Sequence, residues 1–483
     1  MDYVLYGLAA VAAIGIILLA VAIVRTFFIQ EMDRGKPQSI VDQKAQAAYA
    51  TGLLRLVRHK TIAVAVGVEP TAFKNMQKEM ETLFPHVFAT CERIALPGGS
   101  LLLRWPGSTT AAPIVLMAHQ DVVPAPVDGW CCDPFKGEIT DDKVIGRGSF
   151  DTKATLYASL QAVEELITEG FTPAVDIYIA SSADEEVSGG GAQLAVLHLE
   201  QQGIRPVLVL DEGGAIVSGA LPSLKRHLAL IGVIEKGYLN LRFSAKSQGG
   251  HSSTPPKNTP IARLAKFVAK VERRYPLRAK MIPEVAAMFQ TAAKGMAFPY
   301  RLLFGNLWLF KGLVTWLLPL INPYGRALFS TTIAFTMMKG SDAENVIPSE
   351  AYILCNLRTH PVQNIESTVK TLAAIARKYD VDCEILEGRE ATPIVNTKGR
   401  AYHYLVEQIQ KTFPDVLISP YIIFGGTDAR FFTGITDAAL RFSPVRIDNE
   451  DLKKMHGIDE CIAIEALGEA VIFYKSFISD YRP

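Results

Sequence analysis

Hydrophobic and polar positions follow two different periods in the first half of the chain. Residues 114–118, 175–180 and 206–210 are short apolar runs of the kind that forms buried strands. Between the first two runs, residues 152–169 carry apolar side chains at helical spacing, including Leu156 and Leu160. This strand–helix–strand rhythm predicts an α/β domain whose sheet is largely parallel and flanked by helices.

The pattern changes after residue 236. Strand-like and helix-like segments now follow one another in the order 238–245, 261–271, 331–336, 351–357, 362–379 and 381–386. This β-α-β-β-α-β order is typical of a ferredoxin-like α+β domain. We therefore predict an inserted domain at 236–390, which separates two parts of the first domain, residues 45–235 and 391–483.

The N-terminal segment is apolar. Residues 3–24 are 22 positions without a charge, which is long enough to cross a bilayer as a helix. We predict a retained single-pass transmembrane anchor at 3–24 and a linker at 25–44. Ala20-Val21-Ala22 also resembles a signal-cleavage site, so a cleaved signal stays an alternative, although no basic residue precedes the apolar run.

The charges beside this segment bear on its orientation. Arg25, Arg34 and Lys36 follow it, and only Asp2 precedes it. The positive-inside rule would then place most of the chain in the cytoplasm.

A second apolar stretch interrupts the inserted domain at 276–326, which is longer than a simple connection needs. Its centre, residues 302–321, is almost entirely apolar except for Lys311. Three interpretations stay open: an extra helix packed on the protein, a second transmembrane span, or an apolar surface that enters the bilayer interface or lines an acyl-chain channel. Trp308 and Trp316 suit an interface.

Charge and cysteine usage exclude some classes of function. The chain has 49 basic and 49 acidic residues, so no overall field attracts nucleic acid, and we predict no nucleic-acid partner. The six cysteines contain no CxxC pair, which favours free thiols; disulfides stay possible outside the cytosol.

Metal-binding side chains follow several of the predicted strands. His119-Gln120-Asp121, Ser182 to Glu186 and Asp211 each come directly after an apolar run, and Asp151 opens the helix at 152–169. Taken singly, each has an ordinary interpretation as a core histidine, a helix cap or a solvated acidic loop. Because strand ends of one sheet meet at one edge, their convergence predicts a metal site there.

The ordered motifs carry a family resemblance. From about residue 45 to residue 474 the chain resembles the co-catalytic zinc peptidase and deacylase family, which includes glutamate carboxypeptidase, aminoacylase and acetylornithine deacetylase. Within it, the carboxypeptidase S branch, with the N-fatty-acyl-amino-acid synthase/hydrolase, is most similar. The motifs are MAHQDVVP, GRGSFDTK, ADEE, LDEGG, GGHSSTPP, ENVIP, FGGTDAR and KMHGIDE.

The resemblance implies a zinc-exopeptidase-like mixed sheet flanked by helices, with the inserted domain serving as a lid and dimerisation domain. It also implies two Zn²⁺ per subunit and a role for each matching residue. Asp151 would bridge the ions, Glu185 would be the general base and Asp121 would orient His119. The remaining ligands would be His119 and Asp211 for one zinc ion and Glu186 and His456 for the other.

The resemblance further implies substrate-binding residues. His251 would reach the site of a neighbouring subunit, which makes the protein a homodimer. Asn345 and Arg358 would face a carboxylate or oxyanion of the substrate. A substrate-binding loop would contain Gly426, Thr427 and Asp428. His198 and His360 have no counterpart, and we expect them on the surface.

These observations predict a zinc metallopeptidase or amidohydrolase that cleaves dipeptides, short peptides or N-acyl amino acids with a free carboxylate. A membrane-tethered N-fatty-acyl-amino-acid hydrolase/synthase is the alternative, and the apolar stretch at 302–321 favours a hydrophobic acyl group. An inactive scaffold of the same fold is disfavoured, because Glu185 and all five ligand positions are present. The relatives act in a vacuole lumen or outside the cell, so the side of the membrane stays open.

Overall fold

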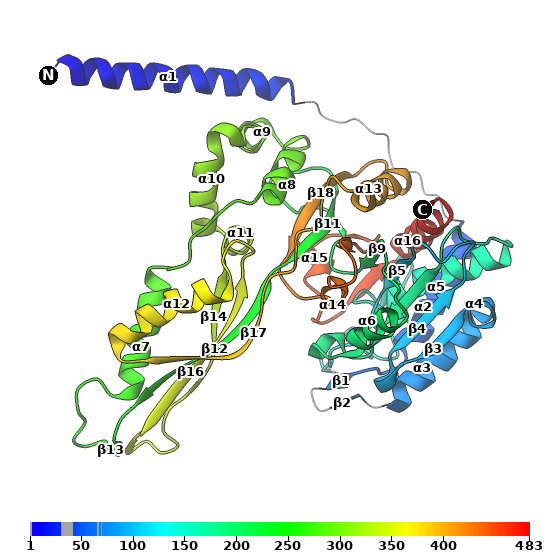
Figure 1. The fold of residues 1–483 in the computed structure, drawn as a ribbon, viewed down its shortest axis with the longest axis horizontal. Coiled ribbons are helices and arrows are strands. Elements are labelled where there is room, and N and C mark those ends of the chain that lie inside the picture. The colour runs from blue at the N-terminus through cyan, green and yellow to red at the C-terminus, as the bar shows by residue number, and fades with distance from the viewer. Residues whose placement is uncertain (1, 30–41, 65–66, 69, 127) are drawn as a thin grey trace.

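The computed structural model describes residues 2–29, 42–64, 67–68, 70–126 and 128–483. Most of the linker predicted at 25–44, with Arg34 and Lys36, lies outside the described residues. The described chain forms one large sheet of ten strands, one small sheet of four strands and three minor sheets of two or three strands, with helices packed on the large and the small sheet (Figure 1).

The large sheet has ten strands in the order β20-β10-β11-β19-β9-β5-β8-β4-β3, and β18 also pairs with β11. Central strand β5 runs parallel to β8 and β9, whereas β4 runs antiparallel to β8 at one side. The predicted mixed sheet is confirmed, with parallel strands at its centre. Its strands are β3 (Glu92–Ala95), β4 (Leu101–Trp105), β5 (Ile114–Met117), β8 (Ile177–Ser181), β9 (Leu208–Asp211), β10 (Ile216–Val217), β11 (Leu228–Glu235), β18 (Leu417–Ile423), β19 (Ala439–Arg441) and β20 (Arg446–Ile447).

Alternation along the central strands divides their side chains between two helical layers. In β5, Ile114 and Leu116 belong to the larger core, and Val115 and Met117 to a smaller one on the opposite face. Helices of the larger core are α2 (Gln43–Val57), α5 (Lys153–Thr168), α13 (Arg400–Thr412) and α16 (Ile464–Ser479); those of the smaller are α6 (Gly191–Gln201) and α14 (Ala429–Phe432).

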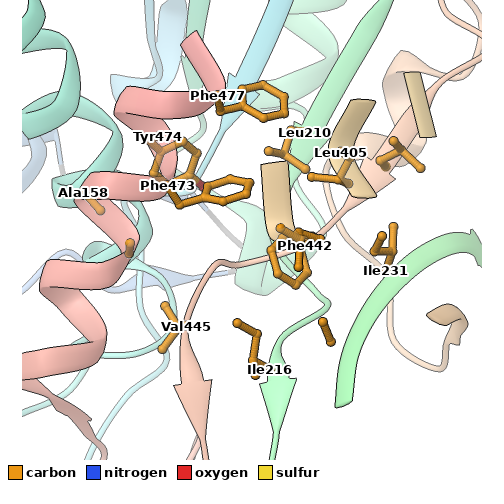
Figure 2. Packing of buried hydrophobic residues seen from close by; sticks show 14 of the residues in the cluster. Ala158, Leu210, Ile216, Ile231, Leu405, Phe442, Val445, Phe473, Tyr474 and Phe477 are labelled. Atoms are coloured by element: carbon orange, nitrogen blue, oxygen red, sulfur yellow. The ribbon is translucent and has the colours of Figure 1, made fainter. Parts of the chain in front are cut away.

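Aromatic side chains of α16 fill the centre of the larger core. Phe473 is fully buried, and its ring centroid lies 5.8 Å from that of Phe442 and 5.6 Å from that of Phe477 (Figure 2). This packing fixes α16 on the sheet whose strand ends carry the candidate ligands.

The small sheet has four antiparallel strands in the order β14-β16-β12-β17. Strands β12 and β16 alternate strictly between buried and partly buried positions, because one face packs on two helices. The predicted β-α-β-β-α-β order is confirmed. Its elements are β12 (Gly237–Lys246), α7 (Pro260–Arg273), β14 (Thr332–Lys339), β16 (Glu350–Thr359), α12 (Ile365–Ala376) and β17 (Asp382–Arg389).

The apolar stretch at 302–321 is two helices rather than one. α9 (Phe298–Gly305) and α10 (Leu307–Ile321) meet at a bend of 100°, between α8 (Pro283–Ala293) and α11 (Pro323–Phe329). They pack partly on the protein, since Phe304, Leu307 and Val314 are buried.

The N-terminal helix α1 (Asp2–Phe27) agrees with the apolar segment predicted at 3–24. In the described residues it is the single helix long and apolar enough to cross a membrane; the bent α9–α10 pair would be a second if both form one span. A signal sequence has the same character, so both interpretations of this segment stay open.

All six cysteines are free thiols. The remaining elements are short or lie at the periphery. These elements are β1 (Ala63–Val64), β2 (Gly67–Val68), α3 (Pro70–Leu83), α4 (Pro85–Thr90), β6 (Glu138–Ile139), β7 (Lys143–Ile145), β13 (Gly250–His251), β15 (Val346–Ile347), α15 (Asn449–Leu452) and β21 (Cys461–Ala463).

Candidate metal centre

The carboxyl ends of three neighbouring strands carry most of the candidate residues. His119 and Asp121 follow β5, Glu185 and Glu186 follow β8, and Asp211 is the last residue of β9. Because β5 lies between the parallel strands β8 and β9, these residues gather at one sheet edge. The loops before α5 and after α15 add Asp151 and His456.

Asp151 lies between two histidines. Its Oδ1 is 3.0 Å from His119 Nε2, and its Oδ2 is 3.0 Å from His456 Nε2. Burial raises the pKa of Asp151, but the hydrogen bonds from His119 and His456 outweigh it and leave that pKa below its usual range. Thr152, not Asp151, is the cap of α5. The carboxylate of Asp151 is therefore directed at the two imidazoles and not at the helix.

Glu186 completes a compact group of ligand atoms. One atom each from His119, Asp151 and Glu186 can be chosen so that all three lie within 4.8 Å of one another. Glu186 Oε2 is 3.2 Å from His456 Nε2, and its Oε1 is buried without a hydrogen-bond partner. A buried carboxylate oxygen without a donor, within a mixed set of nitrogen and oxygen atoms, fits a divalent cation such as zinc.

Asp121 contacts both His119 and the turn that carries Glu185 and Glu186. His119 Nδ1 is 2.9 Å from the Asp121 carbonyl oxygen and 3.3 Å from its Oδ1. The same carboxylate accepts hydrogen bonds from the backbone N–H groups of Glu185, at 3.2 Å, and Glu186, at 3.0 Å. Asp121 thereby fixes both the ring of His119 and the turn that presents Glu185 and Glu186.

Two acidic residues, Asp211 and Glu212, follow one another at the end of β9. The buried carboxylate of Asp211 accepts hydrogen bonds from the backbone N–H groups of Glu212, at 2.9 Å, and Ala429, at 2.7 Å. Burial, followed by the negative charge of Asp151, raises the pKa of Glu212 well above its usual value. No role was predicted for Glu212 from the sequence, although it follows Asp211 in the motif LDEGG at the same strand end.

Glu185 lies at the rim of the metal-binding group. Burial raises its pKa well above the usual value, and the positive charge of His119 opposes that rise. Arg430 Nη1 lies 3.8 Å from Glu185 Oε1. Glu185 is thus a carboxylate largely removed from water beside a cationic guanidinium, an arrangement that suits a proton acceptor.

Two arginines lie beside Gly426, and a third, Arg358, lies close enough to interact with both by charge. A Cβ built on Gly426 would lie 3.4 Å from Nη2 of Arg389 and 3.4 Å from Nη1 of Arg430. Burial lowers the pKa of Arg358 and of Arg389, and the positive charge of Arg430 lowers both further. Arg430 is buried, and its Nε and Nη2 have no hydrogen-bond partner. This arginine cluster, Arg358, Arg389 and Arg430, is a potential anion site that the sequence analysis found only at Arg358.

The loop predicted to bind substrate is tied to the large sheet. Thr427 Oγ1 donates a hydrogen bond to Glu235 Oε1 at 2.6 Å, and Ser182 Oγ donates one to Asp428. Burial, followed by the charge of Asp211, raises the pKa of Asp428 to about 7. Thr427 and Asp428 therefore position the loop, and Gly426 is the member that faces the arginine cluster.

Two predicted residues lie far from this edge within a single chain. His251 and Asn345 are exposed on β13 and beside β15, where Ser252 N–H donates to the Asn345 carbonyl oxygen at 3.0 Å. Figure 1 shows β13 at the tip of the small sheet, away from β5 and β9. The predicted roles of both residues toward substrate stay untested in one chain.

His360 corrects the expectation of a surface position. It is buried, its Nε2 lies 3.3 Å from the Leu328 carbonyl oxygen, and burial, together with the charge of Lys236, lowers its pKa to about 4. The prediction failed because the strand-to-helix turn after β16 folds under α11. His198 is partly exposed on α6.

Glu460 joins the loops that carry Asp151 and His456. Its Oε1 accepts hydrogen bonds from the backbone N–H groups of Gly148, Phe150 and Asp151, each at 3.0 Å. Its Oε2 lies 2.6 Å from Arg147 Nη1, and both side chains are buried. Glu460 was not among the residues predicted from the sequence, although it is the last residue of the motif KMHGIDE.

Comparison with protein families gives a match to the model of Peptidase family M20/M25/M40 over residues 115–480. The N-fatty-acyl-amino acid synthase/hydrolase of Xenopus tropicalis is 32% identical over 482 residues, which cover 96% of this chain and 93% of the relative. The probable carboxypeptidase S-like 2 of Dictyostelium discoideum is 32% identical and covers 84% of this chain and 79% of the relative.

Solved structures share the fold at low sequence identity. Human carnosine dipeptidase 1 superimposes with a TM-score of 0.62 at 16% identity, covering 90% of this chain and 96% of its own. The Bacillus subtilis protein YxeP, a dinuclear metal-binding peptidase of the M20 family, gives a TM-score of 0.52 at 13% identity over 89% and 98% of the two chains.

The contacts of Glu460 lead to a prediction. Glu460→Gln puts an amide against the buried guanidinium of Arg147 and removes the charge that pairs with it, which costs about 3–5 kcal/mol when one partner of a buried pair is lost. We expect reduced thermal stability and at least a tenfold loss of metal affinity, because the Asp151 loop loses its anchor. Isothermal titration with Zn²⁺ measures the affinity.

Glu450→Gln is the matched control, because the pair of Glu450 with Lys453 is exposed. Equal metal affinity in the Glu460 variant and the wild type would remove the positioning role of Glu460.

Proposed function

The chain belongs to Peptidase family M20/M25/M40, and from this premise we propose a di-zinc hydrolase that cleaves the amide bond of substrates with a free carboxylate. One observation carries the proposal: Asp151 directs its two oxygens to two histidines, as a carboxylate between two metal ions would. N-acyl amino acids are the proposed substrate class, and dipeptides are the second candidate.

Each zinc ion would have ligands from different loops. We propose His119 for one ion, Glu186 and His456 for the other, and Asp151 between them. The family resemblance gives Asp211 as the remaining ligand of the first ion. Both carboxylate oxygens of Asp211 already accept hydrogen bonds from backbone N–H groups, which favours Glu212 as that ligand instead.

When bound, the metal ions supply Lewis acidity: they polarise the amide carbonyl and make a water molecule more acidic. Glu185 takes the proton of the attacking water and returns it to the amine nitrogen that leaves. The raised pKa of Glu185 suits the first half of this transfer, since a stronger base accepts the proton more readily. Asp121 contributes by keeping the Glu185 turn in place.

The arginine cluster would hold the carboxylate of the substrate. Arg430 contributes most directly, because its guanidinium is buried, its Nε and Nη2 have no hydrogen-bond partner, and its Nη1 lies 3.8 Å from Glu185 Oε1. A carboxylate held there would lie close to the general base. Charge pairing at this position would select substrates with a free carboxylate over amidated ones.

A substrate with a hydrophobic acyl group on the amide is favoured over a dipeptide. The relatives in Xenopus tropicalis and Homo sapiens are N-fatty-acyl-amino acid synthase/hydrolases, at 32% and 35% identity. Synthesis, the reverse of the hydrolysis, would use the same groups with the proton transfers reversed.

The larger organisation is proposed as follows. Residues 45–235 and 391–483 form the catalytic domain, and 236–390 form a lid and dimerisation domain that presents His251 to a second subunit. Exposed His251 and Asn345 at the tip of the small sheet support a partner there.

We also propose that α1 is retained as a single-pass membrane anchor, with the side of the catalytic domain left open. Burial of Ala22 and Thr26 against the rest of the chain supports retention, because cleavage after Ala22 would disrupt that contact. The mass of the mature N-terminal peptide distinguishes an anchor from a cleaved signal.

The role of Glu185 predicts a separation of metal binding from turnover. Glu185→Ala should keep the metal content of the wild type and lose about 10²–10⁴-fold in kcat, the usual contribution of a general base. Elemental analysis and hydrolysis of an N-acyl amino acid measure the two. Glu384→Ala, at an exposed position of β17, is the control. Near-normal turnover without Glu185 would exclude it as the base.

The ligand after β9 can be identified by a pair of variants. We expect Glu212→Gln to lose about half of the bound zinc, because its carboxylate is free of backbone donors. Asp211→Asn should lower stability but keep two ions, since its oxygens already accept two amides. The opposite result in elemental analysis would establish Asp211 as the ligand, as the family resemblance implies.

Substrate preference tests the arginine cluster and the acyl group together. Among N-acetyl and N-oleoyl amino acids, each with a free or amidated carboxyl group, we expect the N-oleoyl free acid to have the highest kcat/KM. Arg430→Gln should lower kcat/KM at least tenfold for free acids and much less for amides, because only the acids lose an ion pair.

Preference for N-acetyl substrates would contradict the acyl assignment. Equal losses for acids and amides in the Arg430 variant would contradict the carboxylate assignment.

A further inference from the structure

The C-terminal end of α1 is joined to the bend between α9 and α10. Asn306 is fully buried at the bend, and its Nδ2 donates hydrogen bonds to the Ala22 carbonyl oxygen at 3.2 Å and to Thr26 Oγ1 at 2.9 Å. Its Oδ1 accepts one from Trp308 Nε1 at 3.1 Å. A polar side chain thus satisfies the backbone of α1 where that helix meets the body of the protein.

Close packing surrounds this polar contact. The rings of Phe27 and Phe298 lie 5.3 Å apart, and the guanidinium carbon of Arg25 lies 5.7 Å from the ring centre of Trp308. A Cβ on Gly305 would lie only 2.2 Å from Ile29 Cδ1, so a larger residue at this position would displace the Ile29 side chain. Wherever the end of α1 lies relative to a bilayer, the α9–α10 bend lies with it.

α10, which leads away from this contact, and the start of α11 expose large apolar side chains. Trp316 is 65% exposed, Leu320 62%, Ile321 66% and Tyr324 72%. These four residues and Trp308 define the α10 surface. Such a surface marks an interaction site, because apolar groups of this size are seldom left in water together.

The net positive charge of residues 285–341 indicates which partner fits the α10 surface. Residues 285–341 contain five basic residues, Lys294, Arg301, Lys311, Arg326 and Lys339, and no acidic residue. Tryptophan and tyrosine beside lysine and arginine are the side chains that favour the boundary between lipid headgroups and acyl chains. A protein surface would lack the anionic headgroups that this charge bias matches.

From these contacts we propose that the α10 surface inserts into the headgroup region of a lipid bilayer, beside the end of α1. α1 then attaches the chain to the membrane, and the α10 surface fixes the orientation of the body on it. A second copy of the chain on the same surface is the competing occupant. The proposal does not depend on the reaction proposed above.

Tryptophan fluorescence of the full chain in lipid vesicles tests the proposal. The chain has four tryptophans, and Trp308 and Trp316 are the two on the α10 surface. Trp316 is decisive, because it lies ten residues beyond Asn306, about 15 Å along the helix, and so reports on α10 rather than on the end of α1. Trp308→Phe retains Trp316 as a reporter, and Trp308→Phe with Trp316→Phe gives the background of the other two.

We expect lipids brominated in the acyl chain to quench at least a third of the emission of the Trp308→Phe variant, and this quenching to disappear in the double variant. Trp316→Phe with Leu320→Glu should reduce the quenching of Trp308 and leave hydrolysis of a water-soluble substrate unchanged, which shows that the fold is intact. Quenching of Trp316 by aqueous iodide would overturn the proposal. Protection from both quenchers, with cross-linking between chains, would assign the surface to a second copy.

Discussion

The structure depends on holding several carboxylates together at one edge of a sheet. Asp151, Glu185, Glu186, Asp211 and Glu212 meet there with two histidines. Burial raises the pKa of Glu185 and Glu212, because each negative charge is removed from water and faces another. Protonated histidines offset part of this repulsion, and divalent cations would offset more. Folding of this edge and metal binding are therefore coupled: the arrangement that binds the metal is also the one that most needs it.

Backbone amides hold these charges in position. Asp121 accepts two N–H groups of the turn at 185–186, Asp211 accepts those of Glu212 and Ala429, and Glu460 accepts three from the loop that ends at Asp151. In each case a carboxylate from one loop fixes the backbone of another. Neutral donors stabilise a carboxylate without adding a mobile side chain, so the ligands can lie in a fixed arrangement before metal binds. The site is thus a set of loops fixed to one another rather than a row of independent ligands.

The periodicity of apolar residues and the positions of the strand ends predicted more of this structure than the chemistry of single residues did. Apolar runs located β5, β8 and β9, and the rule that strand ends meet brought His119, Glu186 and Asp211 to one edge. Contacts made by tertiary packing were beyond that reasoning. Arg389 and Arg430 meet at Gly426 from β17 and α14, and His360 is covered by α11. The break at Asn306 was missed as well, because an apolar run does not reveal a buried amide that turns the chain by 100°.

Lys236 lies between the end of the apolar insertion and the arginine cluster. It is buried, and its Nζ donates hydrogen bonds to the carbonyl oxygens of Ala327, at 3.1 Å, and Ser330, at 2.8 Å, at the end of α11. Burial, together with the charge of Arg358, lowers its pKa to about 7. The end of the apolar insertion therefore lies beside the arginine cluster. An amphipathic substrate, with a carboxylate at one end and an acyl chain at the other, matches this succession of charged and apolar surfaces better than a dipeptide does, because a dipeptide has no long apolar part to place against the insertion.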